Sequence, residues 1–250
     1  MVRQRTATPL PPVRIRVAPV CLILGDIMGA IKTAEQRKQD SIAFLKSKGV
    51  PVMEHLPVIE EYGEVILRST DDIAKRAIAL MIVAIHAECL NSEMDLSEIK
   101  NIQTGLLDRY KPYEFFTPKE SAFLKEILPG YDAVFFSWQY ECLNVMLWTL
   151  GFIDNLAFPN EICDVANIVG IIHRHTVYDS FLDACVLRSK EEILDEADLI
   201  YRYNWACVNE RINGRSIETI NPGVVVERHR ALNWLINYCN QDWDNITTDT

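Results

Sequence analysis

Residues 131–150 read Tyr131-Asp-Ala-Val-Phe-Phe-Ser-Trp-Gln-Tyr-Glu-Cys-Leu-Asn-Val-Met-Leu-Trp-Thr-Leu150. This segment has the length of a long helix and is apolar around nearly its whole circumference. A helix of a globular protein can be apolar on all sides only where other elements cover it. Gly151 follows directly, and glycine is common just beyond the C-terminus of a helix. The sequence therefore predicts a buried central helix around which the rest of the chain packs.

Helical patterns continue on both sides of this segment. Thr117-Pro-Lys-Glu120 and Ser189-Lys-Glu-Glu192 are capping boxes, and Asn221-Pro222 places a proline at a first helical position. The helical spacing of apolar residues predicts the remaining helices. We expect a mainly α fold, a single domain over residues 34–250 with little strand, the one candidate strand being residues 64–67. The expected helices number about eight and cover residues 34–48, 69–90, 95–110, 117–128, 131–150, 161–174, 189–213 and 222–238.

The first 33 residues differ from this pattern. Four arginines precede the short apolar run at residues 17–24, which is the order found in a secretory signal peptide. However, Pro19 interrupts the run and Asp26 follows it closely, which disfavours secretion. We expect residues 1–33 to form an N-terminal arm, either an extra strand at residues 13–20 or a disordered segment.

Charge is unevenly distributed along the chain. Residues 1–48 hold nine Lys/Arg and three Asp/Glu, so 16 of the 25 basic and 32 of the 35 acidic residues lie in residues 49–250. Repulsion from phosphates makes this acidic body a poor binder of nucleic acid. It favours a basic partner or a cation, although acidity can also serve solubility alone.

The cysteines and the hydropathy pattern indicate the cellular compartment of the protein. Seven cysteines occur, with no C-x-x-C pair, and most lie in apolar helical pattern. Such usage is typical of free thiols in a reducing compartment, so we expect a cytoplasmic protein. No segment is long and uncharged enough to span a membrane, and no membrane association is expected. Without paired spacing, a zinc site is not predicted.

The central helix carries one polar stripe, Ser137, Glu141, Asn144 and Trp148, at helical spacing. A carboxylate on such a helix must reach a cation, a hydrogen-bond donor or a cleft, because burying an isolated charge is costly. Glu141 is therefore a candidate acid/base residue in a pocket wall. The alternative is a structural ion pair with Arg202 or Arg228.

The last sixty residues supply the other candidates. Glu227 and His229 are candidate catalytic residues, but their spacing on one helix points them apart. The stripe at residues 195, 198, 202, 205 and 209 predicts a solvated face on the helix at 189–213. Aromatic residues among charges are candidates for ligand contact. The candidate ligand-binding residues are Trp148, Arg202, Trp205, Trp234 and Trp243.

The C-terminal tail holds three carboxylates, Asp242, Asp244 and Asp249. They are weak candidates for Ca²⁺ or Mg²⁺ ligands, because the segment lacks the ligand alternation and the glycine of an EF-hand. The alternative is a docked tail, with Trp243 packing near the central helix or Trp205 and any site lying where the tail meets Glu141. No nucleotide-binding or hydrolase motif occurs, and no cofactor is predicted.

Four strings together resemble one family. They are residues 137–151, residues 187–202, Val226-Glu-Arg-His-Arg-Ala-Leu-Asn-Trp-Leu235 and Asp242-Trp-Asp-Asn-Ile-Thr-Thr-Asp-Thr250. In this order they are similar to the bacterial domain-of-unknown-function family 4272, over about residues 35–250. The resemblance implies a cytosolic, mostly helical bacterial domain. It implies no activity, ligand or catalytic residue.

Two functional hypotheses follow. The first is an acidic binding or regulatory domain without enzymatic activity, which engages a protein partner or a second copy of itself around residues 189–213 and 222–239. The second is a hydrolase-like or metal-assisted enzyme that uses a carboxylate cluster around Glu141. They differ in geometry: converging carboxylates around a solvent-filled cleft favour the enzyme, and carboxylates each paired with an arginine disfavour it.

Overall fold

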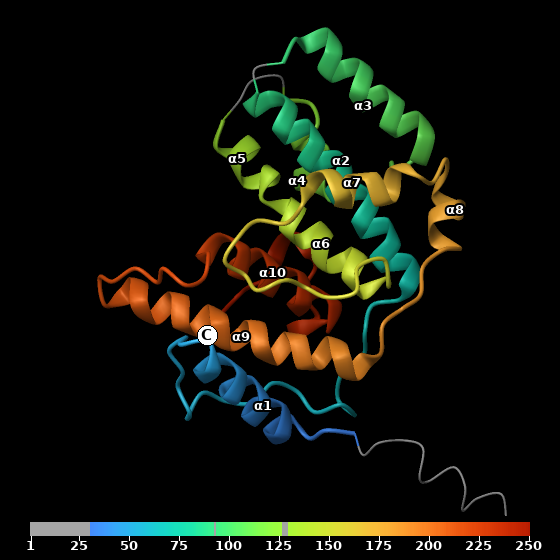
Figure 1. Ribbon diagram of the computed structural model, residues 1–250. Coiled ribbons are helices and arrows are strands. Elements are labelled where there is room, and N and C mark those ends of the chain that lie inside the picture. The colour runs from blue at the N-terminus through green and yellow to red at the C-terminus, as the bar shows by residue number, and fades with distance from the viewer. Residues whose placement is uncertain (1–30, 93, 127–129) are drawn as a thin grey trace, which may run out of the picture. The chain divides into compact units, whose positions relative to one another are not determined.

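A computed structural model describes residues 31–92, 94–126 and 130–250 (Figure 1). Within these ranges the chain is helical and contains no β-strand, which confirms the mainly α fold. Residues Lys32–Thr250 form one compact unit. The α-helices are α1 (Ala34–Ser47), α2 (Thr70–Asn91), α3 (Leu96–Tyr110), α4 (Pro118–Phe123), α5 (Tyr131–Ser137), α6 (Gln139–Thr149), α7 (Val165–His173), α8 (Tyr178–Leu182), α9 (Lys190–Ile212) and α10 (Pro222–Leu235), followed by the 3₁₀ turns η2 (Tyr238–Asn240) and η3 (Trp243–Asn245).

The core is organised around α6. Every residue of α6 is buried, as the apolar pattern predicts. This helix packs against α2 on one side and α10 on the other; α10 in turn packs against α9, and α9 against α1 (Figure 1). The second helix that is buried along most of its length is α2. A helix buried on opposite sides needs apolar residues all round, and this explains why neither α2 nor α6 shows an amphipathic pattern.

The predicted central helix is interrupted at Trp138, which separates α5 from α6. The backbone at Trp138 stays near helical values, but its carbonyl accepts a tighter bond from the amide of Glu141, at 3.0 Å. The indole of Trp138 lies so close to Gly223 in α10 that a Cβ on Gly223 would stand 2.7 Å from the ring. The break thus accompanies close packing between Trp138 and the start of α10.

The first residues of the helices agree with the positions predicted from the sequence better than the last residues do. Thr117 and Ser189 both form the predicted capping boxes, and Asn221 caps α10 through the amide of Gly223. By contrast, α10 ends at Leu235 rather than near residue 238, and α8 had not been predicted. The candidate strand at residues 64–67 is wrong, because these residues form no β-ladder in the described chain. The predicted arm falls on residues 1–33, of which residues 1–30 lie outside the described ranges.

The expectation of a solvated polar face on α9 is also wrong. Asp198 and Arg202 are 0% and 3% exposed and form a two-pronged ion pair, with nitrogen–oxygen distances of 2.7 and 2.8 Å. Arg202 is covered by the irregular segment at residues 57–64, whose Pro57 carbonyl accepts from it at 3.1 Å, whereas Asp195, Trp205 and Asn209 of the same stripe are half-buried. A buried pair of this kind needs such extra partners to offset the loss of hydration.

Gly151, which ends the central helix, adopts a left-handed backbone with φ of 81°. A Cβ at this position would meet the Val186 carbonyl oxygen at 2.7 Å. We therefore expect Gly151→Ala to lower the free energy of unfolding by about 2–4 kcal/mol, from backbone strain and the clash together. Urea denaturation measures the loss. Gly214→Ala is the matched control, since Gly214 has a φ of 69° but open space around it, and it should cost clearly less. Equal losses in both variants would show that the clash with Val186 is unimportant.

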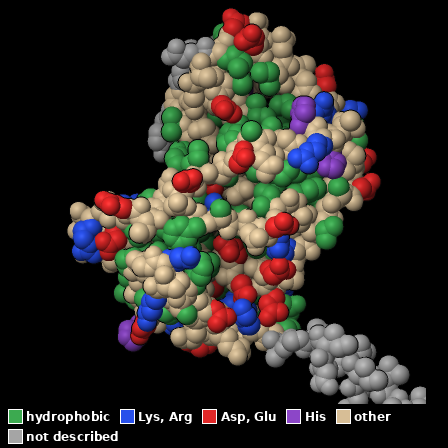
Figure 2. All heavy atoms as spheres, in the orientation of Figure 1, with side chains coloured by type: hydrophobic (Ala, Val, Ile, Leu, Met, Phe, Trp, Pro, Cys, Tyr) green, Lys and Arg blue, Asp and Glu red, His purple; other side chains and the backbone are tan. Residues whose placement is uncertain are grey.

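Among the described residues, none of the helices has both the length and the apolar character needed to cross a bilayer. Figure 2 shows acidic side chains spread over the visible face among fewer basic ones. This distribution matches the charge balance of residues 49–250.

Candidate functional site

A cleft of about 510 Å³ opens between α9, α10, the segment at residues 57–64 and the C-terminal tail. Helix α9 contributes Ala197 and Tyr201 to it, and the first residues of the segment add an apolar wall. A volume of this size is in the range of small-ligand and side-chain binding sites. The complete lining is Pro57, Val58, Ile59, Glu60, Glu64, Ala197, Tyr201, His229, Asn233, Ile236, Tyr238, Asp249 and Thr250.

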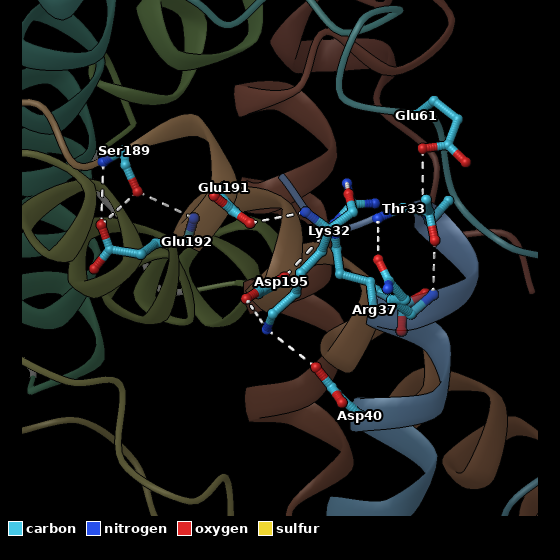
Figure 3. Close-up of polar contacts among 12 residues, drawn as sticks. Lys32, Thr33, Arg37, Asp40, Glu61, Ser189, Glu191, Glu192 and Asp195 are labelled. Carbon is cyan, nitrogen blue, oxygen red and sulfur yellow. Dashed lines mark hydrogen bonds and ion pairs between the residues drawn. The ribbon is translucent and has the colours of Figure 1, made fainter. Parts of the chain in front are cut away.

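The wall at residues 57–64 has no regular structure of its own, so it is positioned by side chains from neighbouring helices. Arg202 holds the Pro57 carbonyl, and Arg37 of α1 donates to the Glu60 carbonyl at 3.4 Å. The carboxylate of Glu61 accepts from the amide of Ala34 at 3.0 Å (Figure 3). Backbone carbonyls in an irregular segment require such donors, and here the donors fix one side of the cleft.

Helix α1 is in turn fixed to the first turns of α9. Figure 3 shows Lys32 reaching Asp195 of α9 at 2.8 Å and Asp40 of α1 at 3.1 Å. The amide of Lys32 also donates to Glu191 at 3.0 Å, and Arg37 lies 3.6 Å from Asp195. The hydrogen bond and charge of Asp195 raise the pKa of Lys32. This network ties α1 to α9, and through Arg37 to the cleft wall.

The tail is held by side-chain amides. Asn233 of α10 donates to the Thr247 carbonyl at 2.9 Å, and Asn204 of α9 donates to the Thr248 carbonyl at 2.8 Å. Both asparagines are buried. Gln241 accepts from the amide of Thr247 at 3.0 Å. Consecutive carbonyls of the tail are thus fixed to two different helices, and Asp249 is carried to the cleft rim.

His229 forms the buried part of the cleft. It is 2% exposed, and its Nδ1 has no hydrogen-bond partner in the part of the chain that the structure describes. Burial lowers the pKa of His229 to about 4, against a smaller opposing effect of the Asp249 charge. The imidazole is therefore neutral at neutral pH. The stability that this neutral form provides is present above about pH 6.5 and is lost as the pH falls through about 4.

The rim of the cleft is acidic. Glu64 and Asp249 are exposed and Glu60 is half-buried, and none of the lining residues in the described ranges is Lys or Arg. Glu64 accepts from the amide of Glu61 at 3.0 Å. Low-dielectric walls concentrate the field of like charges in such a cleft. The arrangement attracts positive charge towards the neutral imidazole at its base.

Glu141, the leading sequence candidate, lies elsewhere. It is 2% exposed, pairs with Arg228 at 3.2 Å and accepts from the amide of Cys163. Arg228 also donates to the Ala157 carbonyl at 2.6 Å. The structure therefore provides the ion pair with Arg228, one of the two alternatives for this carboxylate. Glu141 lines a small cavity of about 160 Å³ with Ser137 and Cys163, away from the tail residues of the cleft.

Glu227 and His229 diverge, as their spacing predicts. Glu227 is buried, accepts from the Cys142 thiol at 3.2 Å and lies 3.7 Å from Arg230. Burial raises the pKa of both Glu227 and the Cys142 thiol. A thiol that holds its proton is a poor nucleophile. The structure does not bring Glu141, Glu227 and His229 to one cleft.

The aromatic candidates contact arginines and one another. The guanidinium of Arg188 lies 4.7 Å from the Trp148 ring, and that of Arg68 lies 5.0 Å from Trp234. Trp243 is buried and packs edge-on against Trp234 at 5.6 Å. Trp205 is half-buried against the core. These contacts are cation–π and core packing interactions that stabilise the helices.

The three tail carboxylates have separate surroundings. Asp244 accepts from the amide of Lys119 at 3.3 Å, whereas Asp249 lies at the rim of the cleft. The backbone carbonyl of Asp242 accepts the bond that begins η3. Within the described ranges, no group of three or more His, Cys, Asp or Glu residues is placed to hold a metal ion.

Sequence reasoning missed Glu60, Glu64 and Glu196. The first two lie in a segment without periodic pattern, so nothing local indicates that it crosses α9. Glu196 lies within the α9 helix and is half-buried, and this burial raises its pKa to about 7. The neighbouring Arg228 opposes that effect, and Asp195 adds to it. Only the three-dimensional packing of α9 distinguishes Glu196 from the exposed Glu192.

The comparisons with known proteins give one match. The family model described as "Domain of unknown function (DUF4272)" matches residues 37–246. No curated protein shows significant similarity to the sequence, and no solved structure does so. The matched range includes α9, α10, the wall at residues 57–64 and most of the tail, so it contains nearly all of the cleft. The chain belongs to the DUF4272 family of domains of unknown function.

Proposed function

We propose that this protein is a binding domain without enzymatic activity, whose cleft receives a positively charged side chain of a protein partner. One observation carries the proposal: an acidic rim, with no Lys or Arg in the described lining, surrounds a buried and neutral His229. Electrostatic complementarity of this kind speeds encounter with a basic partner and selects against acidic ones.

The walls of the cleft suit a lysine or arginine side chain. Val58, Ile59 and Ile236 offer apolar surface for the aliphatic stem, and Tyr238 lines the same cleft with an aromatic ring for the charged head. Long basic side chains combine both properties, because their stems bury easily while the head stays charged. A cation over a tyrosine face gains a further 0.5 kcal/mol or so.

The state of His229 favours binding over acid–base catalysis. A histidine whose pKa is about 4 is a weak base at neutral pH, since general bases work best with a pKa near the operating pH. As a neutral group, His229 does not repel an incoming cation.

We infer a cytoplasmic setting from the thiols. Cys89, Cys142 and Cys207 are free and buried, which is typical of proteins in reducing compartments. We propose that this domain works in the bacterial cytosol, and the resemblance to a bacterial family supports this. There the excess of acidic residues disfavours nucleic acid as the partner.

The test is binding of short labelled peptides followed by fluorescence anisotropy. The probes are a glycine-rich pentapeptide with a central arginine, the same peptide with lysine, and one with norleucine, which keeps the stem and lacks the charge. We expect the two cationic peptides to bind and the norleucine peptide to bind at least about tenfold more weakly. Binding should weaken as salt is added.

The variant Glu60→Gln with Glu64→Gln should weaken binding of the arginine peptide by about tenfold. Its control is Asp183→Asn with Glu218→Gln, which removes the same charge from exposed positions outside the cleft lining. The control should bind like the wild type. Equal weakening in both double variants would show that net charge, not the cleft, attracts the peptide. Equal binding of all three peptides to the wild type would also refute the proposal.

A further inference from the structure

A second cavity, of about 280 Å³, lies between α4, α5, α6, α10 and η3. It shares no lining residue with the acidic cleft. Its lining combines two cations, two carboxylates, one amide and three aromatic rings. These residues are Lys119, Asp132, Phe135, Phe136, Gln139, Arg230, Trp243 and Asp244.

The amide of Gln139 is the first sign of a ligand. Gln139 is 1% exposed and lines the cavity, and its Oε1 has no hydrogen-bond partner within the described residues. Leaving a buried polar atom unpaired costs about 1–3 kcal/mol, so such atoms are rare in folded proteins. A ligand that brings an N–H donor into the cavity would satisfy this oxygen.

Arg230 supplies the complementary charge. Its guanidinium carbon lies 4.9 Å from the centre of the Phe135 ring and 5.9 Å from that of Trp243, which fixes its position. The nearest ion-pair partner in the described chain is Glu227 at 3.7 Å, beyond hydrogen-bond distance. Guanidinium donors held in place by two rings are well suited to bind a carboxylate.

The cavity also carries negative charge. Asp132 is exposed, and Asp244 lies beside Lys119, whose ammonium donates to the Asp244 carbonyl at 2.8 Å. One arginine and one lysine face two aspartates, so the lining as a whole is neutral but polarised. Such a surface favours a ligand with both charges over a simple anion or cation. The rings of Phe135, Phe136 and Trp243 offer an apolar wall.

We propose that this cavity binds a free α-amino acid with an apolar side chain. Its carboxylate pairs with Arg230, its ammonium group donates to Gln139 Oε1 and faces Asp132, and its side chain packs on the aromatic wall. This site is independent of the acidic cleft, which selects for positive charge alone.

Calorimetric titration of the full chain tests the proposal with three matched ligands. L-Phenylalanine carries both charges, L-phenylalaninamide lacks the carboxylate and 3-phenylpropionate lacks the ammonium group. We expect L-phenylalanine to bind with a Kd in about the micromolar to millimolar range, and each of the other two to bind at least about tenfold more weakly. No heat with L-phenylalanine, or equal affinity for all three, would overturn the proposal.

Two variants locate the site. Gln139→Leu removes the amide at similar volume, and Arg230→Met removes the charge but keeps an unbranched stem; each should weaken L-phenylalanine binding by about tenfold or more. Arg230→Lys keeps the charge and should bind L-phenylalanine better than Arg230→Met does.

The control variant is Arg215→Met, since Arg215 is exposed and pairs with Glu210 outside the cavity. Circular dichroism confirms folding of each variant. Unchanged affinity in folded Gln139→Leu and Arg230→Met would place binding elsewhere and refute the site.

Discussion

Replacing Arg228 by Met is expected to lower the free energy of unfolding by about 3–5 kcal/mol. Arg228 and Glu141 are both nearly inaccessible and lie 3.2 Å apart, at the contact between α10 and α6. The substitution leaves the Glu141 carboxylate buried with only the amide of Cys163 as a described hydrogen-bond partner. It also removes the donor to the Ala157 carbonyl, which helps to fix the chain after α6.

Urea denaturation near neutral pH measures this loss, and an unchanged m-value confirms that the denatured state is comparable. The double variant Arg228→Met with Glu141→Met removes both charges, and we expect it to recover most of the stability, because a buried ion pair is often no better than apolar packing. If Arg228→Met costs less than about 1 kcal/mol, or if the double variant is no more stable than the single one, Glu141 is not held by this pair.

Replacing Glu196 by Gln is expected to stabilise the protein at alkaline pH, by about 2–3 kcal/mol. Burial raises the pKa of Glu196 to about 7 from an ordinary value of 4.5. The stability provided by protonated Glu196 is therefore fully present below about pH 4.5 and is lost as the pH rises through about 7. Glutamine has the shape of the protonated acid but does not ionise, so the variant keeps this stability at high pH.

The measurement is the difference in unfolding free energy between variant and wild type at a series of pH values. The difference should be largest at about pH 8.5 and approach zero near pH 4.5. Glu218→Gln, at an exposed position, is the control and should show no such dependence. A difference that is constant with pH, or a less stable variant at pH 8.5, would mean that Glu196 ionises normally in the folded protein.

The starts of the helices and the burial of the central helix α6 were predictable, because both depend on patterns of neighbouring residues in the sequence. Ser189 and Thr117 cap their helices through contacts three residues away, and such spacings are visible in any sequence. Likewise, α6 is apolar all round because it is covered on all sides. The break at Trp138 was not predictable, since it accompanies the packing of one indole against Gly223, more than eighty residues further along the chain.

The candidate site was predictable only in part, for the same reason. His229 was identified as a candidate, and its divergence from Glu227 follows from helical geometry. The acidic wall was missed, because Glu60 and Glu64 lie in an irregular segment whose path depends on Arg202 and Arg37. Burial of Arg202 was not predictable for the same reason: the segment that covers this side chain has no pattern of its own.

The most direct test of the acidic cleft is nuclear magnetic resonance of the protein with isotope-labelled histidines, titrated with the arginine-containing pentapeptide. The chain has five histidines, and His229 is the one that lines the cleft. We expect the ring signals of His229 to shift progressively as the arginine peptide is added, and to shift much less at the same concentrations of the norleucine peptide. Glu60→Gln with Glu64→Gln should reduce the shift. Unchanged His229 signals under saturating peptide, or shifts confined to His173 and His175, would contradict the proposed site.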